Sequence, residues 1–186
     1  MHTNKYNIYY FIDKFDKIKL NKLDKNIHLI YRNYHQKIDY NLIKKLKLFC
    51  KIKQIKFYIL NNIKLAIKLQ LDGVYIPSFN KKIIKNIYLK KKNFSIIGSA
   101  HNLKEIRIKE RQDVDKIFLS PIFDTKKKTG LGIIKFNNLS SYSKANIVAL
   151  GGINKFNINK LKLTKVDGFA SISYIDNLYK WLILKN

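Results

Sequence analysis

Short segments rich in glycine and serine recur in the second half of the chain, where they could bind an anion. They read GSAH at 98–101, SPIFDT at 120–125, GGIN at 151–154 and GFASIS at 168–173. Backbone N–H groups at the start of a helix attract a phosphate, and glycine leaves room for it to approach. Gly151 and Gly152 could supply such groups, and Ser173 could add a hydroxyl. A tight turn would use the same glycines, but the pairing of the two segments favours phosphate binding.

Eight short runs of β-branched and aromatic residues alternate with amphipathic stretches along the chain. The four glycine- and serine-rich segments lie at the ends of four of these runs. This alternation predicts βαβ units and a parallel sheet. We place the strands at Ile8–Ile12, Ile27–Tyr31, Ile55–Leu60, Gly73–Ile76, Phe94–Gly98, Lys116–Leu119, Ile147–Leu150 and Gly168–Ile172. A spacing of about 23 residues per unit predicts an α/β fold, a parallel (β/α)8 TIM barrel with short helices.

The stretches between the strands show helical spacing. Apolar stripes recur every three or four residues at Leu42, Leu46 and Phe49, and at Leu178, Trp181 and Leu182. Asn102 followed by Glu105 predicts a helix N-cap with a reciprocal capping residue. This start would leave Ser99 and His101 on the loop beyond the fifth strand, at the catalytic face of a barrel. The longest irregular stretch is expected at 121–132.

Length and composition limit the class of protein. A chain of 186 residues with 46% hydrophobic residues can bury one core, so we expect a single compact domain over residues 1–186. The one cysteine, Cys50, excludes an internal disulfide and a zinc site built from several cysteines. The first residues show no apolar signal segment, and no stretch reaches the ~18 apolar residues of a membrane span. These features predict a cytoplasmic protein without a membrane partner.

The net charge of +26 would suit a nucleic-acid partner. However, only Arg32, Arg107 and Arg111 among the 38 basic residues are arginines, and arginine is the preferred reader of bases and phosphates. The lysines are spread over almost every segment, as a bias toward A and T codons would produce. We therefore expect scattered, solvated lysines and no nucleic-acid partner.

Five segments, in this order along the chain, resemble successive motifs of the thiamine phosphate synthase/TenI family. They are GVYIPS (73–78), GSAHNLKE (98–105), PIFDT (121–125), ALGGI (149–153) and DGFASIS (167–173). The resemblance covers roughly residues 7–175, and the five motifs in register make it specific. It implies a (β/α)8 barrel. Thiamine phosphate synthases couple hydroxymethylpyrimidine diphosphate to a thiazole phosphate with magnesium, and TenI-like members include thiazole tautomerases.

The resemblance also implies roles for eight residues of this chain. Those matching the phosphate site are Gly151, Gly152, Ile172, Ser173 and Lys128, and those matching other substrate contacts are Arg32, Ser99 and Thr125. Two of these matches are incomplete. Lys127 stands where the family has its second loop threonine, and the glutamine, glutamate and lysine around the arginine are replaced here by Ile30, Asn33 and Tyr34.

The metal and acid/base positions depart from the family pattern. The family's Asn-Asp pair after strand three is Leu60-Asn61 here, and its aspartate after strand four is Asn80. Mg²⁺ prefers carboxylate oxygens, and these amides supply no negative charge. The resemblance therefore implies a Mg²⁺ cofactor that these residues do not support, and no metal ligand is assigned. Pro121 stands where tautomerases have a histidine, and proline cannot transfer a proton.

Other titratable residues have simpler expected roles. His101 belongs to a Ser-x-His element that family members share, and we expect a turn residue rather than an acid/base group. His28 and His35 are expected at the surface near the second strand. Asp13 and Asp124 are the remaining acid/base candidates at the active face, although capping and turns are commoner uses of aspartate.

Three functions remain open from the sequence. The first is an enzyme, or degenerate enzyme, of thiamine biosynthesis that binds a thiazole phosphate or a related phosphorylated heterocycle. The second is a noncatalytic TenI-like barrel that binds a metabolite or regulates a partner. The third, nucleic-acid binding, rests on charge alone. A barrel supports all three, so the choice depends on the site. No catalytic residue is assigned, and a homo-oligomer remains open.

Overall fold

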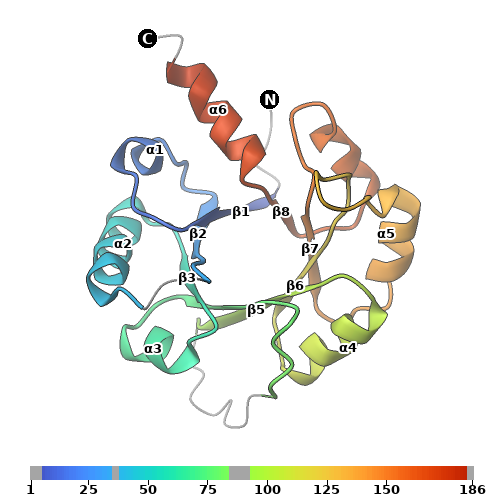
Figure 1. Ribbon diagram of the computed structural model, residues 1–186, viewed down its shortest axis with the longest axis horizontal. Helices are drawn as coiled ribbons and strands as arrows, with labels where there is room; N and C mark the ends of the chain where they lie inside the picture. The colour runs from blue at the N-terminus through green and yellow to red at the C-terminus, as the bar shows by residue number, and fades with distance from the viewer. Residues whose placement is uncertain (1–5, 35–37, 84–92, 184–186) are drawn as a thin grey trace.

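A computed structural model describes residues 6–34, 38–83 and 93–183 of the protein. Eight parallel strands close into a barrel in chain order (Figure 1). They are β1 (Asn7–Ile12), β2 (Ile27–Tyr31), β3 (Phe57–Leu60), β4 (Gly73–Ile76), β5 (Ser95–Ala100), β6 (Lys116–Leu119), β7 (Asn146–Leu150) and β8 (Gly168–Ala170). β1 pairs with both β2 and β8, which closes the ring. The predicted parallel (β/α)8 barrel is confirmed.

Short helices surround the strands on the outside of the barrel (Figure 1). They are α1 (Lys17–Asn21), α2 (Tyr40–Lys53), α3 (Ile63–Lys68), α4 (Leu103–Arg111), α5 (Gly132–Ser140), the 3₁₀ helix η2 (Ile158–Leu163) and α6 (Ser173–Ile183). The first four begin at side chains that accept a hydrogen bond from a backbone N–H three residues later: Asp16, Asp39, Asn62 and Asn102. These N-caps fix where each helix starts after its strand.

All eight strands lie where the sequence predicts them, with small differences in the bounds of β1, β3, β5, β7 and β8, and those at the ends of β5 and β8 affect the site. β2, β4 and β6 have the predicted bounds. β5 continues to Ala100, so Ser99 lies in the strand and not on the loop, as we had expected. β8 ends at Ala170, and Ile172 therefore precedes α6 outside the strand.

The core has two layers, because successive strand residues point to opposite faces. In β1, Tyr9 and Phe11 point into the barrel, whereas Ile8 and Tyr10 face the helices. The interior is filled by side chains that are largely aromatic: Tyr9, Phe11, Ile30, Tyr58, Tyr75, Ile97, Phe118, Val148 and Ala170. The rings of Tyr9 and Phe118 pack edge to face, with centroids 4.8 Å apart. A ligand must therefore bind at the end of the barrel and not inside it.

Two expectations about exposed and buried side chains need correction. The α2 stripe packs as predicted, with Leu46 buried, but in α6 Leu178 is 42% exposed. The side chains of Trp181 and Leu182 lie outside the described residues. His28 is half-buried and not exposed as expected, because its ring packs against Tyr9 with centroids 5.2 Å apart. His35 lies outside the described residues.

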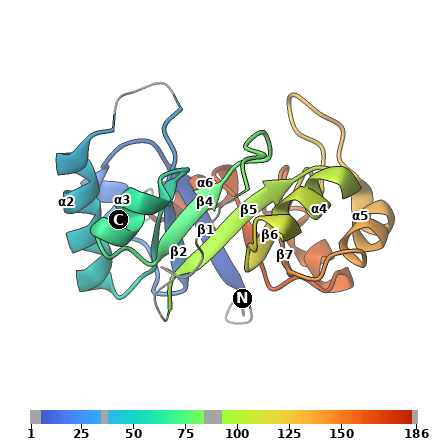
Figure 2. The same cartoon turned by 90° about the horizontal axis from the view of Figure 1, so that it is seen from below.

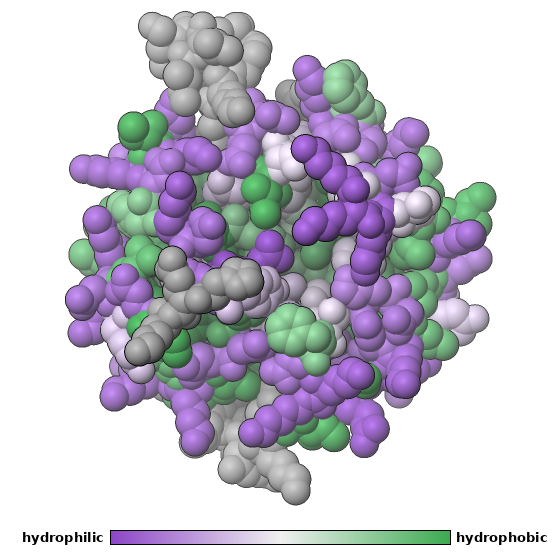
Figure 3. All heavy atoms as spheres, viewed as in Figure 1, coloured by the Kyte–Doolittle hydropathy of each residue, from purple (hydrophilic) through white to green (hydrophobic). Residues whose placement is uncertain are grey.

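Polar side chains are scattered over the viewed face of the molecule (Figure 3). Figure 3 shows hydrophilic side chains over the whole viewed face, with apolar side chains scattered between them and no single stripe. Among the described helices, none is both long and apolar enough to span a bilayer.

Candidate functional site

All eight strands are parallel, so the loops that follow them gather at one end of the barrel, here called the mouth. Figure 2 shows the long loop between β6 and α5 projecting beyond this end. A cavity of about 340 Å³ opens at the ends of β1 and β2, beside the start of α6. Its lining includes Phe11, Asp13, Arg32, Tyr34 and Ile172. The cavity is large enough for a small phosphorylated ligand.

Four of the five predicted phosphate residues, Gly151, Gly152, Ile172 and Ser173, lie on neighbouring loops after β7 and β8, and Ile172 is the one of the five that lines the cavity. Leu150 of β7 pairs with Ala170 of β8, which makes the loops after these strands neighbours. The buried Ser171 hydroxyl donates to the Ile153 carbonyl at 3.0 Å and accepts from the Tyr174 N–H at 3.1 Å. It thus joins the β7 loop to the start of α6. Sequence reasoning singled out the neighbouring Ser173 and missed this tie.

Gly151 and Gly152 have left-handed backbone conformations, with φ of +95° and +70°. A Cβ atom at Gly151 would lie 2.7 Å from the Pro121 side chain, and one at Gly152 would collide with the Asp124 carbonyl. The glycines therefore make room for the loop after β6. This packing requires glycine whether or not a phosphate binds, so their role in phosphate binding stays a prediction.

The loop after β6 is folded by its own polar side chains. The Thr125 hydroxyl accepts from the N–H groups of Lys127 and Lys128, at 3.3 and 3.0 Å. The Asp124 carboxylate accepts from the Gly130 N–H at 2.6 Å. Asp124 thus has the turn role expected of it, and Thr125 holds the backbone of the exposed Lys128.

Arg32 lies at the end of β2, above the aromatic interior. Its guanidinium lies 4.3 Å from the centroid of the Phe11 ring and 5.6 Å from that of Tyr34. The Tyr34 ring in turn packs against Phe79 of the loop after β4 (residues 77–82, here called the β4 loop), with centroids 5.8 Å apart. Both Arg32 and Tyr34 line the cavity. This wall combines a fixed positive charge with flat rings, which suits an anionic, planar ligand.

Ser99 is buried at the end of β5 and is engaged within the chain. Its hydroxyl accepts from the Tyr75 hydroxyl and from the Ser78 N–H, both at 3.0 Å. Burial raises the pKa of Tyr75 to about 12, so the phenol stays protonated and donates. Ser99 thus fixes the start of the β4 loop.

The two positions where the family resemblance implies metal carboxylates contact each other. The side-chain N–H of Asn80 donates to the side-chain oxygen of Asn61 at 2.9 Å. Neither amide is charged, and the pair uses an oxygen that a cation would need. In the described part of the chain, no three His, Cys, Asp or Glu side chains are grouped so as to hold a metal ion. These residues do not fit a Mg²⁺ site.

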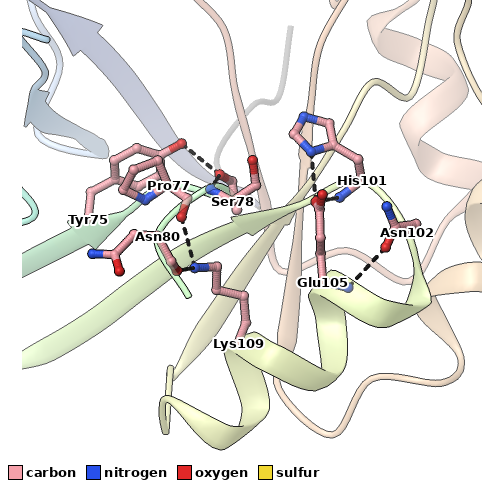
Figure 4. Close-up of polar contacts among 9 residues, drawn as sticks. Tyr75, Pro77, Ser78, Asn80, His101, Asn102, Glu105 and Lys109 are labelled. Carbon is pink, nitrogen blue, oxygen red and sulfur yellow. Dashed lines mark hydrogen bonds and ion pairs between the residues drawn. The ribbon is translucent and has the colours of Figure 1, made fainter. Parts of the chain in front are cut away.

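Lys109 of α4 is a buried ammonium that sequence reasoning missed. It is 0% exposed and donates to the carbonyls of Pro77 and Asn80, both at 2.8 Å (Figure 4). It also donates to the Gln112 side chain at 2.8 Å. Burial lowers its pKa to about 8. The sequence did contain a signal, because Lys109 lies three residues after the buried Ile106 and so on the inward face of the helix.

The contact between His101 and Glu105 supports the turn role expected for His101. It also corrects the prediction that Glu105 caps α4 reciprocally with Asn102. Asn102 caps α4 by accepting from the Glu105 N–H at 2.9 Å. The Glu105 carboxylate does not complete a capping box on Asn102. It accepts from the His101 N–H at 2.8 Å and contacts Nδ1 of the same histidine at 2.8 Å.

Comparison with known proteins identifies the family. A family model described as thiamine monophosphate synthase matches residues 25–175. The chain belongs to the thiamine monophosphate synthase family. The likeness first seen in the five motifs is thereby confirmed. Because the match starts at residue 25, it includes β2 and the position of Arg32 as well as the five motifs.

Curated relatives agree with this assignment. The chain is 31% identical over 134 residues to the thiamine-phosphate synthase of Clostridium acetobutylicum, covering 70% of this chain and 64% of the relative. The enzyme of Latilactobacillus sakei is 33% identical over 138 residues, covering 71% and 61%. The putative thiamine-phosphate synthase 2 of Aquifex aeolicus is 27% identical, covering 88% of each chain. The match thus spans less than two thirds of the first two relatives.

Solved structures of low identity show the same fold. A thiamine phosphate pyrophosphorylase from Pyrococcus furiosus superposes with a TM-score of 0.70 at 23% identity, covering 91% of this chain and 87% of that one. A structure titled native KDPGal reaches a TM-score of 0.65 at 8% identity, covering 91% and 84%. At these identities the likeness concerns the barrel alone, which many unrelated functions share.

Proposed function

We propose that this family member acts in thiamine biosynthesis and binds a thiazole phosphate, or a related phosphorylated heterocycle, at the mouth of the barrel. The names of its relatives suggest the class of ligand. The observation that carries the proposal is the tie between the Ser171 hydroxyl and the Ile153 carbonyl, which brings the loops after β7 and β8 together. Barrels often hold a phosphate between these two loops.

In the proposed complex the phosphate lies at the start of α6. Gly151, Gly152, Ile172 and Ser173 bind it through backbone N–H groups and the Ser173 hydroxyl, because N–H groups at a helix start attract anions. Lys128 closes over it from the loop after β6. The nearby Asp176 carboxylate would oppose an anion, but it accepts from the Tyr10 hydroxyl at 2.6 Å and pairs with Lys19 at 3.4 Å. These partners reduce its repulsion.

The heterocycle occupies the adjacent cavity. Arg32 and Tyr34 form its wall, where a guanidinium and an aromatic ring can contact a planar group. Ser99 and Thr125 take part by shaping the loops around the ligand, since their hydroxyls already bind loop N–H groups.

A noncatalytic binding barrel is the second candidate, and it has its own support. Asn61 and Asn80 bond to each other where a synthase of this family would hold Mg²⁺. Pro121 stands where a tautomerase has its histidine. Turnover assays with and without Mg²⁺ separate the candidates, because a binding barrel gives saturable ligand binding without product.

Isothermal titration calorimetry with thiazole phosphate tests the proposal. Ser173→Ala should weaken binding by roughly 1.5–3 kcal/mol, since it removes one hydrogen bond to a charged group. Lys128→Met should weaken it as well, and Lys162→Met, at an exposed lysine of η2, serves as the control. A bulky residue at Gly152 is a poor test because it would displace the loop after β6. Unchanged affinity in Ser173→Ala and Lys128→Met would contradict the proposed site, and salt-sensitive duplex binding would favour a nucleic-acid role.

A further inference from the structure

The loop after β4, residues 77–82, is held from the outer side of the barrel by two side chains near the end of α4. The Lys109 ammonium donates to the carbonyls of Pro77 and Asn80, both at 2.8 Å. The Gln112 amide donates to the carbonyls of Asn80 and Lys82, at 3.0 and 2.8 Å. Figure 4 shows Lys109 extending from α4 to the two carbonyls that it binds. We call the pair Lys109–Gln112 the anchor of the β4 loop.

The anchor fits its surroundings closely. The stem of Lys109 passes over Gly98 of β5, where an added Cβ would lie 2.8 Å from the Lys109 Cδ. Glycine at this position therefore makes room for the lysine. Both anchor side chains are 0% exposed, and the Gln112 oxygen accepts from the Lys109 ammonium at 2.8 Å. A buried ammonium is tolerated only when its protons are hydrogen-bonded, and here three acceptors are fixed around it.

The β4 loop carries three contacts to the mouth. Its Ser78 N–H binds the Ser99 hydroxyl, and its Asn80 amide binds Asn61 at the end of β3. Its Phe79 ring packs against Tyr34, which lines the cavity. A continuous set of contacts thus runs from the anchor through Phe79 to the aromatic wall of the cavity.

We propose that Lys109 is a positioning residue of the ligand site, which with Gln112 fixes the β4 loop and, through Phe79 and Tyr34, the wall that contacts the heterocycle. The identity of the ligand rests on the proposed function, whereas the anchoring of the loop does not. The phosphate loops follow β7 and β8, on the other side of the closed barrel. Lys109 therefore affects recognition of the ring and leaves recognition of the phosphate unchanged.

Amide hydrogen exchange without ligand tests the anchor. Lys109→Met keeps the stem and removes the ammonium, and Lys104→Met makes the same change at an exposed position of the same helix. The amides of Ser78, Asn80 and Lys82 each donate to an acceptor within the loop or β5. In Lys109→Met they should exchange on the order of tenfold faster, while amides of β7 and β8 keep their rates. Unchanged rates, or an equal rise across all strands, would overturn the proposal.

Calorimetry with two ligands tests the link to the site. Lys109→Met should weaken thiazole phosphate binding by about tenfold but leave binding of inorganic phosphate within about twofold. A purely structural loss would reduce the two affinities together. Lys109→Arg, which keeps charge and donors, should restore part of the selective loss, and Gln112→Leu should reproduce it. Equal losses for both ligands, or none, would overturn the proposal. If the unmodified protein binds neither ligand, the proposed function fails, and the exchange rates still decide whether the anchor holds the loop.

Discussion

The side-chain N–H of Asn80 donates to the side-chain oxygen of Asn61 across the ends of β3 and β4, at 2.9 Å. The bond has a direction, since Asn80 is the donor and Asn61 the acceptor. Asn61 also has a left-handed backbone, with φ of +56°, a conformation that asparagine tolerates better than most residues. The aspartates that the family resemblance implies at positions 61 and 80 would therefore have different effects on the stability of this protein.

Asn80→Asp should destabilise the protein, whereas Asn61→Asp should not. The first change places a carboxylate against an acceptor oxygen, and we expect a loss of about 0.5–1.5 kcal/mol in the free energy of unfolding. Asn61→Asp keeps an acceptor for the Asn80 amide, so its free energy of unfolding should stay within about 0.5 kcal/mol of that of the unmodified protein. Urea titrations of both variants measure this difference. Equal effects would show that the two amides do not pair in this direction.

The double variant Asn61→Asp, Asn80→Asp should acquire a response to Mg²⁺ that the original protein lacks. Two facing carboxylates repel each other, and a bound divalent cation would relieve that repulsion and stabilise the folded state increasingly, by RT ln(1 + c/Kd), as its free concentration c rises. Thermal melts with increasing MgCl₂ provide the measurement, and NaCl of equal ionic strength is the control. A Mg²⁺ response of equal size in the original protein would contradict our interpretation of this half of the mouth.

The neighbouring serines at the start of α6 should have separate effects. Ser171→Ala removes a buried hydroxyl that both donates and accepts, so it should cost about 1–3 kcal/mol of unfolding free energy. Ser173 is exposed, and Ser173→Ala should change stability by less than about 0.5 kcal/mol while weakening ligand binding. Chemical denaturation combined with calorimetry distinguishes them. Equal destabilisation by the two variants would argue against Ser171 as the tie.

His28 should make the protein less stable at acidic pH. Burial, with the nearby charges of Lys56 and Lys116, lowers its pKa from 6.5 to about 4 in the folded state. The unfolded chain therefore binds more protons between these values, and stability falls as pH drops from about 6.5 to 4. In His28→Phe, we expect the free energy of unfolding to fall by about 1–3 kcal/mol less over this pH range than in the unmodified protein. Urea unfolding at pH 7 and pH 4.5 tests it, and parallel pH dependence in both proteins would contradict the assignment.

The sequence predicted the strands well because their signals are local. Short runs of β-branched, other aliphatic and aromatic residues located β2, β4 and β6 to the residue, and Gly73 and Pro77 mark the two ends of β4. The end of β5 was placed too early because Gly98 and Ser99 look like a turn, whereas pairing with β4 and β6 extends the strand to Ala100. Tertiary pairing overrode local preference there.

The site was predictable only where barrel geometry determines it. Parallel strands bring residues 151 and 173 to adjacent loops in any such barrel, so their proximity could be expected. The pairing of Asn61 with Asn80 depends on how the β4 loop folds, and that fold depends on Lys109. A lysine on a helix is normally assigned to solvent, because burying its charge is costly. Here two backbone carbonyls and one side-chain amide oxygen accept from the Lys109 ammonium and stabilise it in the interior. The two carbonyls are close to Lys109 in space but distant from it in the sequence, so the sequence does not reveal them.

The pairing of β1 with β8 sets the point during synthesis at which the cavity at the mouth can form. Ile8 pairs with Phe169, and the cavity at this seam is lined by Tyr10 from the first strand and Asp176 from the last helix. Tyr10 emerges from the ribosome long before Asp176 has been synthesised. A nascent chain therefore lacks one wall of this cavity until α6 has been translated. The cavity proposed to bind the heterocycle is complete only in polypeptides in which β1 and β8 have already paired.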